Sequence, residues 1–286
     1  MAGHPFSFVE EKGIWKFIIA GSSNGRTSPS GGEYPGSNPG PATKIMQLKV
    51  LSWNIWCGTY LKEVISFLKK EQPDIIALQE VLEEENGNIA LTIAKELGYE
   101  CVYALGMHMP AKFLNNKEID QDKSISFGNA VLSKYPIISS KIHDLPQGEN
   151  SRPAIQANIK IGDEILHVFS LHLKHTHQQP MEMQNIQADK LAEVIPNDKS
   201  IVMGDFNCLP DSYPIQKISK ILKNTEPDKN TPTWCQYIGG CSVCQIAEIK
   251  YKLDYIFVTK DIQAEEFKAL ESSGSDHLPV SVLIEI

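Results

Sequence analysis

Positive charge, cysteine and long apolar runs are all scarce in this chain of 286 residues, and each shortage excludes a class of protein. Lys and Arg together number 27 against 35 acidic residues. The formal net charge of −8 therefore argues against a protein that coats nucleic acid non-specifically. Six cysteines are too few for a secreted disulfide framework. No apolar run approaches the length of a membrane span, so we expect no membrane span.

The start of the chain lacks the order of a secretory signal. Glu10, Glu11 and Lys12 precede a short apolar patch, with no clear cleavage site after it. We therefore expect a cytoplasmic protein with reduced thiols. Residues 21–41 are rich in Gly, Ser and Pro and show no periodicity. The codons for Gly36 to Pro39 can match the T-loop of a tRNA gene. We expect residues 1–45 to be a disordered or spurious N-terminal extension.

From residue 46 to residue 286 the pattern is regular, and the hydrophobic content of 42% can supply a core. Apolar runs of strand length alternate with amphipathic stretches, which predicts an α/β domain that we expect to be a monomer. The predicted strands are Lys49–Trp53, Ile75–Leu78, Asn129–Ser133, Ala157–Ile161, Leu166–Leu171, Ile201–Met203, Tyr255–Val258 and Val280–Ile284. Helical spacing begins at Leu61 and again at Ala188.

Polar side chains stand at the ends of these strands. Four strands are followed by polar residues, which are Asn54, Glu80, His172 and the pair Asp205 and Asn207. Two later strands are preceded by polar residues, which are Asp254 and the pair Asp276 and His277. If those two strands run antiparallel to the other four, all these groups meet at one sheet edge.

The chemistry of this set favours a metal site. Glu80, Asp205 and Asp276 offer hard carboxylate oxygens and Asn54 offers an amide oxygen, which suits Mg²⁺, with Mn²⁺ as an alternative ion. A single acid at a strand end is more simply a cap or a loop charge. Six such coincidences make that simpler interpretation much weaker. In an extended chain, Asp205 and Asn207 would point to the same side because they are two residues apart.

Seven segments carry a family resemblance. They are LSWNIW, DIIALQEV, FGNAVLSKYPI, FSLHLKH, IVMGDFNCLPDS, KLDYIFV and GSDHLPV. Together and in this order they resemble the endonuclease/exonuclease/phosphatase superfamily, also called the deoxyribonuclease I fold. The resemblance covers about residues 49–286 and implies that residues 46–286 are the catalytic domain. It also implies a four-layer sandwich of two mixed β-sheets faced by helices.

The resemblance implies a magnesium-dependent phosphodiesterase and assigns roles to matching positions. Glu80 would be the principal metal ligand, with Asn54 and Asp276 beside it. His277 would be the general base or a phosphate contact, oriented by Asp254. Asp205 would manage the proton of the leaving group or position the nucleophile. The remaining pair, Asn207 and His172, would donate hydrogen bonds to phosphoryl oxygens.

The substrate stays open at this point. The segments are similar to those of 3′-deadenylases, which favours a nucleic-acid 3′ end or another nucleic-acid phosphodiester. The alternatives are a sphingomyelinase-like or small-molecule phosphodiesterase or phosphatase, and a binding module that kept the fold and lost catalysis. Arg152 is the only arginine after Arg26, and it is a candidate phosphate contact or a solvated loop residue. Cys235, Cys241 and Cys244 are more simply reduced loop cysteines than zinc ligands.

Overall fold

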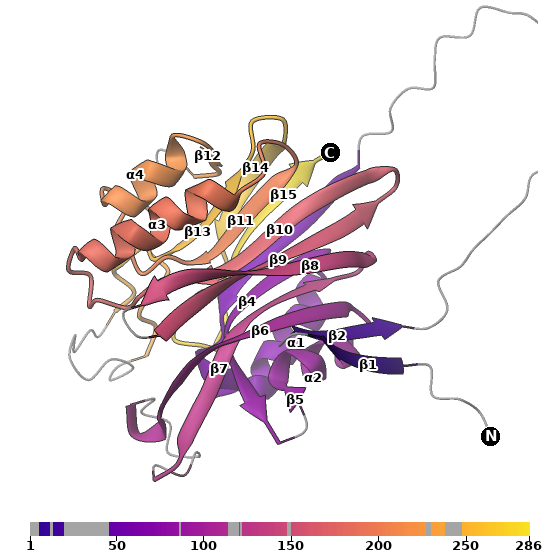
Figure 1. The fold of residues 1–286 in the computed structure, drawn as a ribbon, viewed down its shortest axis with the longest axis horizontal. Coiled ribbons are helices and arrows are strands. Elements are labelled where there is room, and N and C mark those ends of the chain that lie inside the picture. Colours follow the sequence, from indigo (N-terminus) through magenta and orange to yellow (C-terminus); the bar gives the residue numbers. More distant parts are fainter. Residues whose placement is uncertain are drawn as a thin grey trace, which may run out of the picture.

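The computed structural model describes residues 6–11, 14–19, 46–85, 87–113, 120, 122–147, 150–226, 230–237 and 248–286. The strands form two mixed sheets (Figure 1). The nine-stranded sheet has the order β1-β2-β6-β7-β4-β3-β15-β14, with β5 beside β4. Its strands are β1 (Phe6–Glu11), β2 (Ile14–Ile19), β3 (Gln47–Asn54), β4 (Ile75–Glu84), β5 (Gly87–Asn88), β6 (Glu100–Pro110), β7 (Ser124–Ser133), β14 (Gln263–Ala269) and β15 (Val280–Glu285).

The six-stranded sheet has the order β12-β13-β11-β10-β9-β8. Its strands are β8 (Ile137–Gln147), β9 (Asn150–Ile161), β10 (Glu164–His172), β11 (Ser200–Asp205), β12 (Lys223–Asn224) and β13 (Asp254–Val258). The helices are α1 (Leu61–Glu71), α2 (Ile89–Leu97), α3 (Glu182–Val194) and α4 (Tyr213–Ser219), with short 3-10 turns η1 (Trp56–Gly58) and η2 (Ala111–Phe113). Every strand predicted from the sequence is confirmed, and both predicted helices are present.

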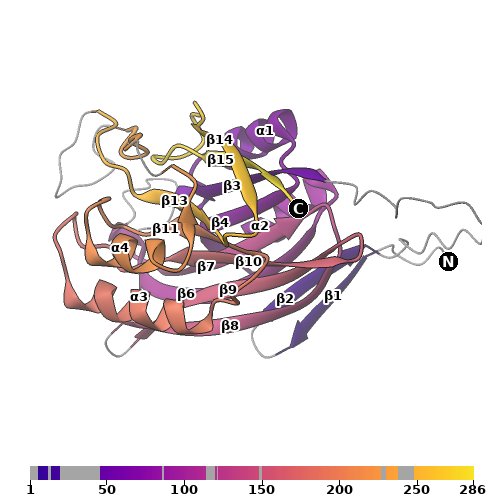
Figure 2. The same cartoon turned by 90° about the horizontal axis from the view of Figure 1, so that it is seen from above.

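The layers follow from alternating side chains on the strands. On β3, Leu48 and Val50 enter a core between the two sheets, while Leu51 and Trp53 face the opposite way onto α1 and α2. The helices α3 and α4 cover the outer face of the six-stranded sheet. Figure 2 shows α1 and α3 on opposite outer sides of the sandwich. The four-layer fold implied by the family resemblance is therefore confirmed.

Local chemistry explains where two helices begin and end. The side chain of Asn88 accepts a hydrogen bond from the backbone N–H of Leu91 and so caps the start of α2. Gly98 adopts a left-handed conformation with φ of 72° and ends that helix. On α1, Val64 and Leu68 are four residues apart and fully buried, which places one helix face on the sheet.

Two strands belong to the stretch expected to be an N-terminal extension. β1 pairs with β2, and β2 pairs antiparallel with β6 from Ile14 beside Ala104 to Phe17 beside Cys101. These two segments therefore have regular structure and continue the sheet at its β6 edge. A domain boundary at residue 46 stays a prediction.

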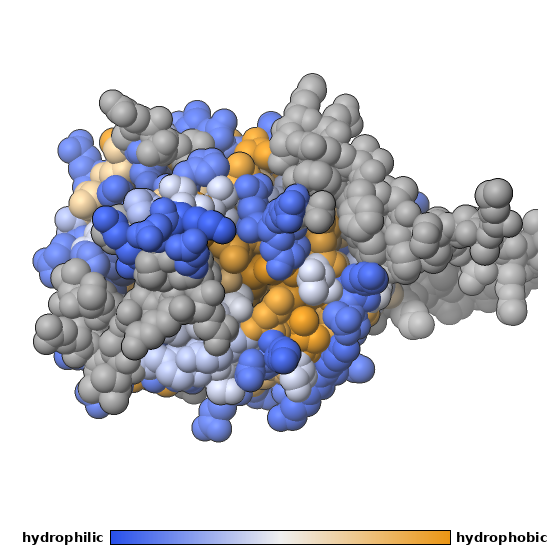
Figure 3. Space-filling model, turned by 90° about the horizontal axis from the view of Figure 1, so that it is seen from below, coloured by the Kyte–Doolittle hydropathy of each residue, from blue (hydrophilic) through white to orange (hydrophobic). Residues whose placement is uncertain are grey.

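Some large hydrophobic side chains remain exposed on the surface of the protein. Seen from below, they gather in the middle of one face with hydrophilic residues around them (Figure 3). Large hydrophobic side chains that stay exposed include Tyr60, Leu105, Ile138, Ile165, Met181, Ile186, Tyr213 and Ile221. They come from different elements of the fold, and exposed hydrophobic side chains of this number are ordinary for a folded protein unless they group with others. Among the described residues no helix is long and apolar enough to cross a membrane.

Candidate active site

The predicted polar residues converge where the two sheets end side by side. β3 and β4 are parallel in one sheet, and β10 and β11 are parallel in the other. β13 and β15 run antiparallel to their neighbours β11 and β3, as expected. The expectation of a single sheet edge was wrong, because the residues come from both sheets. The side-chain nitrogen of Asn54 joins them, at 3.1 Å from both Glu80 Oε1 and Asp205 Oδ2.

A chain of acidic and imidazole groups runs through the centre. His277 Nδ1 lies 2.9 Å from Asp254 Oδ2, and the hydroxyl of Thr233 donates to the same oxygen at 2.6 Å. On the other side of the ring, His277 Nε2 lies 3.7 Å from Asp205 Oδ2. His172 Nε2 approaches that oxygen at 3.4 Å. Asp254 is fully buried, and its contact with Nδ1 fixes the orientation of the His277 ring.

Burial and close charges shift the pKa of each member of this chain. Burial disfavours the imidazolium of His277, but Asp254, Asp205 and Asp276 outweigh it and raise the pKa to about 10. Burial raises the pKa of Asp205 to about 7, against the opposing charge of His277. Burial, helped by the charges of Arg152 and His277, holds the pKa of His172 well below its usual range. At neutral pH His277 is therefore charged and His172 is neutral.

Glu80 and Asp276 form the acidic side of the site. Glu80 has a left-handed φ of 53° at a register shift in the pairing of β4 with β7, and such a bulge redirects a side chain. Trp234 Nε1 donates to Asp276 Oδ2 at 2.9 Å. Burial, and then the charge of Asp276, raise the pKa of Glu80. Burial also raises the pKa of Asp276. Asp276 is buried and Glu80 is half-buried, and two neighbouring carboxylates in this setting fit a divalent cation, which would compensate their charge.

Asn54 is oriented by the turn that follows it. Its side-chain oxygen accepts from the backbone N–H of Trp56 at 3.1 Å, and its nitrogen faces the two carboxylates. In this orientation Asn54 donates to the acids and does not present its oxygen to them. The ligand atoms of Asp205, Asp254 and His277 also lie within 4.8 Å of one another. The oxygen of Asp254 that faces His277 already accepts from Thr233, so this carboxylate is better suited to orientation than to metal binding.

Asn207 occupies a tight turn after β11. Gly204 allows β11 to approach β10, since a Cβ there would lie 2.0 Å from Leu171 O. The backbone N–H of Asn207 donates to Asp205 Oδ1 at 2.8 Å, and its side-chain nitrogen donates to Leu173 O at 3.1 Å. Its side-chain oxygen lies 2.9 Å from Nδ1 of His175. Through this contact His175, which was not predicted as a site residue, is connected directly to the site.

Arg152 is buried and is not a solvated loop residue. Only 6% of it is exposed, and its NH1 donates to Leu173 O at 2.8 Å and to His172 O at 3.3 Å, while its Nε donates to Gln147. Burial lowers the pKa of its guanidinium to about 10, and the charges of Glu80 and Asp205 oppose that shift. Arg152 therefore braces the end of β10 and brings a positive charge to the acidic cluster.

Two buried glutamines of α3 support the site and were not predicted as functional. Gln184 Nε2 donates to Lys174 O at 2.9 Å and to Asn207 O at 3.0 Å. Gln187 Oε1 accepts from Lys174 N at 3.0 Å, and its Nε2 donates to Pro146 O at 2.8 Å. Their spacing of three residues on a helix was the available signal, since it places two amides on the buried face.

One described cysteine touches the site, since Cys57 Sγ lies 3.9 Å from Glu80 Oε2. Cys57, Cys101, Cys208 and Cys235 are buried and form no disulfide. Burial raises the pKa of the Cys208 thiol to about 12, which opposes a role as nucleophile. The expectation for Cys241 and Cys244 lies outside the described residues.

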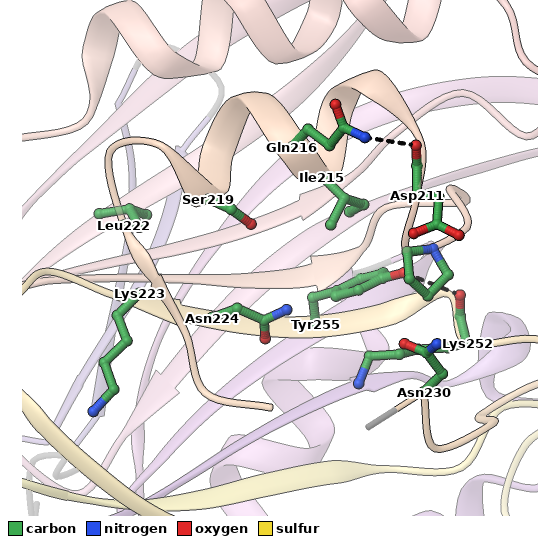
Figure 4. Close-up of a pocket in the computed structure, with 11 residues that line it drawn as sticks. Asp211, Ile215, Gln216, Ser219, Leu222, Lys223, Asn224, Asn230, Lys252 and Tyr255 are labelled. Carbon is green, nitrogen blue, oxygen red and sulfur yellow. Dashed lines mark hydrogen bonds between the residues drawn. The ribbon is translucent and has the colours of Figure 1, made fainter. Parts of the chain in front are cut away.

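A separate cavity of about 530 Å³ lies beside α4 and contains none of the predicted site residues. Its lining includes Ile215, Asn224 and Tyr255, and the side chain of Gln216 donates to the backbone oxygen of Asp211 (Figure 4). Lys252 also lines it, but this buried amine is paired with the carboxylate of Glu226. The charge of Lys252 is therefore compensated.

Comparisons with known proteins relate this chain to a protein family and to solved structures. The sequence model of the Endonuclease/Exonuclease/phosphatase family matches residues 51–277. A family structure from Beutenbergia cavernae DSM 12333 has 17% identity and a TM-score of 0.66, covering 84% of this chain and 72% of that one. One from Leptotrichia buccalis C-1013-b has 20% identity and a TM-score of 0.65, covering 84% and 100%.

A third similar structure is that of ANGEL2, described as a 2′,3′-cyclic phosphatase in complex with adenosine-2′,3′-vanadate. It has 16% identity and a TM-score of 0.61, covering 85% of this chain and 97% of that one. At these identities the structural likeness establishes the fold. No curated protein sequence matched the chain.

Proposed function

Because the chain belongs to the endonuclease/exonuclease/phosphatase family, we propose that it is a magnesium-dependent phosphodiesterase. The observation that carries the proposal is the buried chain from Asp254 through His277 to Asp205, with Glu80 and Asp276 beside it. Burying several acidic groups close together lowers the stability of a fold. Such clusters are typical of functional sites, so this one favours a catalytic site. A non-catalytic binding module would have no need of an oriented imidazole beside a buried acid.

Glu80 and Asp276 would hold the divalent ion, with Asn54 beside them. This side is favoured because the charge of Asp276 makes the ionised form of Glu80 more costly, a cost that a cation would offset, whereas Asp254 is already committed to His277. Mg²⁺ suits a site with one or two carboxylates and room for waters and phosphate oxygens, and Mn²⁺ is an alternative ion. A bound ion would polarise the phosphate and stabilise the leaving oxyanion.

His277 would contact the phosphate as an imidazolium. Its Nδ1 side is held by Asp254, so its Nε2–H points toward Asp205 and toward any oxygen placed between them. A group whose pKa is about 10 is a poor base at neutral pH. Of the two roles that the family resemblance left open, hydrogen bonding to a phosphoryl oxygen is therefore favoured over proton abstraction.

Asp205 would take the proton of the attacking water, since its pKa of about 7 suits a general base near neutrality. Neutral His172 would donate a hydrogen bond from Nε2 to a phosphoryl oxygen. An amide nitrogen has two hydrogens and Leu173 takes one from Asn207, which leaves the other for a phosphoryl oxygen. Arg152 would add positive potential for the bound phosphate, although its NH1 and Nε also hold the scaffold.

Nucleic-acid phosphodiesters are the favoured substrates. ANGEL2, which shares the fold, is described with an adenosine-2′,3′-vanadate, and this supports a nucleoside phosphate ester as the substrate class. A sphingomyelinase-like or small-molecule activity is the alternative. A panel of single-stranded RNA, single-stranded and nicked DNA, a 5′-tyrosyl oligonucleotide, sphingomyelin and inositol phosphates separates them. We also propose that residues 46–286 form the catalytic domain, as a cytoplasmic monomer.

The test is magnesium-dependent hydrolysis of bis(p-nitrophenyl) phosphate. Removing the ion with EDTA should stop turnover, and Glu80→Gln should abolish it at saturating Mg²⁺ because the charge that holds the ion is lost. The matched control is Glu164→Gln, which removes an exposed carboxylate on β10. Metal-independent turnover, or Glu80→Gln activity within a few-fold of the control, would contradict the proposal.

A further inference from the structure

Three aromatic rings gather on the surface beside the acidic side of the site, and we call Trp56, Tyr60 and Tyr237 the aromatic platform. The ring planes of Trp56 and Tyr237 differ by 26° with centroids 5.9 Å apart. Tyr60 lies 5.3 Å from Tyr237 at 37° and 6.2 Å from Trp56 at 60°. Tyr60 is 36% exposed, and the other two rings are half-buried. The exposed parts of these rings are available for contact with a ligand.

The platform is fixed next to the inferred metal ligands at both of its ends. The backbone N–H of Trp56 donates to the side chain of Asn54 at 3.1 Å. The residue before Tyr237 is Gln236, whose backbone N–H donates to Asp276 O at 2.8 Å. The hydroxyl of Tyr237 donates to Ser273 O. A group stacked on the platform would therefore lie close to a phosphate held at the site.

The backbone that presents Trp56 is unusual. Trp56, Cys57 and Gly58 have φ values of 46°, 50° and 70°, so three successive residues are left-handed. For a residue with a large side chain this conformation is a clear outlier, and it raises the energy of the backbone. Outliers of this kind gather at ligand sites, because the surrounding structure must maintain them. Cys57 is buried, so the turn anchors itself through its middle residue and places Trp56 at the surface.

We propose that the aromatic platform stacks on an unpaired nucleobase next to the scissile phosphate, which makes single-stranded nucleic acid the substrate class. This deepens the proposed phosphodiesterase function and rests on it. A base has two flat faces, and stacking on aromatic side chains binds it whatever its sequence. In a duplex both faces are covered by neighbouring base pairs, so the platform selects single strands or frayed ends.

The charge and the ring angles favour a base over other occupants. The chain has a net charge of −8, so its overall charge does not favour binding along an extended phosphate backbone. Stacking supplies affinity without added positive charge. A quaternary ammonium group, as in a choline lipid, is held within an aromatic cage. Only Trp56 and Tyr60 meet at a steep angle, 60°, while the plane of Tyr237 lies within 37° of both, so the three rings are not the mutually steep walls of a cage.

The experiment measures binding separately from catalysis. Fluorescence anisotropy compares a labelled phosphorothioate oligothymidylate with a base-free strand of the same length, in Mg²⁺, on the full chain. Vesicles that contain sphingomyelin are the lipid probe. Tyr60→Leu removes the most exposed ring and Tyr60→Phe keeps it. The control is Tyr213→Leu, which removes a tyrosine with 42% exposure from α4 in the opposite outer layer.

The oligothymidylate should bind about 5- to 150-fold more tightly than the base-free strand, the range that stacking of one base gives. Tyr60→Leu should remove most of this difference, while Tyr60→Phe and Tyr213→Leu should retain it. Three outcomes would overturn the proposed stacking. They are equal affinity for the two strands, a difference in affinity that remains in Tyr60→Leu, and binding that depends on Tyr60 only for the vesicles. Base-dependent binding without hydrolysis of any phosphodiester would instead refute the proposed function and leave the platform standing.

Discussion

Replacing Asp254 with Asn removes one negative charge from the centre of the site with little change in shape. The carboxylate is fully buried, and one of its oxygens accepts from both His277 Nδ1 and the Thr233 hydroxyl. An asparagine oxygen can still accept from Thr233, so the fold should be retained. What the variant loses is the anion that orients and charges the imidazole.

The expected loss of rate follows from these contacts. A hydrogen bond to a charged group contributes about 1.5–3 kcal/mol, and this one also fixes the orientation of the His277 ring. Burial disfavours the imidazolium, and Asp254 is the strongest influence that raises its pKa to about 10. Without Asp254 the pKa of His277 should fall and a smaller fraction of the ring should be charged. Losing a positioned proton donor or acceptor costs roughly 10²–10⁴-fold in rate.

Two measurements on one preparation test this reasoning. The first is kcat for bis(p-nitrophenyl) phosphate at saturating Mg²⁺, and the second is an NMR titration of the His277 ring. The control is Asp261→Asn, which changes an exposed carboxyl whose oxygen accepts from the backbone N–H of Lys199. A kcat within a few-fold of this control would refute the role of Asp254. An unchanged His277 titration beside a large rate loss would show that charge is not the reason.

The remaining predictions concern other parts of the site. His277→Ala should lower kcat roughly 10²–10⁴-fold, while His177→Ala at an exposed position should have little effect, and equal losses would place the wrong histidine in the site. The kcat/KM should rise with pH through about 7, because Asp205 accepts a proton only after losing its own, and Asp205→Asn should remove that limb. A profile with the opposite slope would make Asp205 an acid. Gln184→Leu leaves two backbone oxygens without their donor and should lower kcat about tenfold with a smaller change in KM, whereas loss of thermal midpoint alone would indicate a purely structural role. A chain that starts at Met46 should match the full chain in thermal midpoint and turnover, and a lower midpoint would mean that the β1–β2 hairpin belongs to the domain.

The sequence by itself determined the strands, their polar ends and the family. Runs such as Ile201–Met203 are buried on both faces, so their apolar character is a local signal that needs no knowledge of the partner strand. The residues after them, such as Asp205, stand out because a carboxylate at the end of a buried strand needs a reason. Short edge strands carried weaker signals. β14 alternates between exposed and half-buried residues, so little hydrophobic contrast marked it.

Only the tertiary structure decided which groups meet and in which protonation state. The sequence left Arg152 as either a phosphate contact or a solvated loop residue and gave His175 no role, yet contacts with Leu173 and Asn207 bring both into the site. Local patterns cannot reveal such contacts, because they join residues more than twenty positions apart. The pKa values of His277 and Asp205 are a further case, since they depend on distances between side chains from different strands and both sheets. Electrostatic interactions act through space and fall with distance, so proton positions follow from the fold and not from the order of residues.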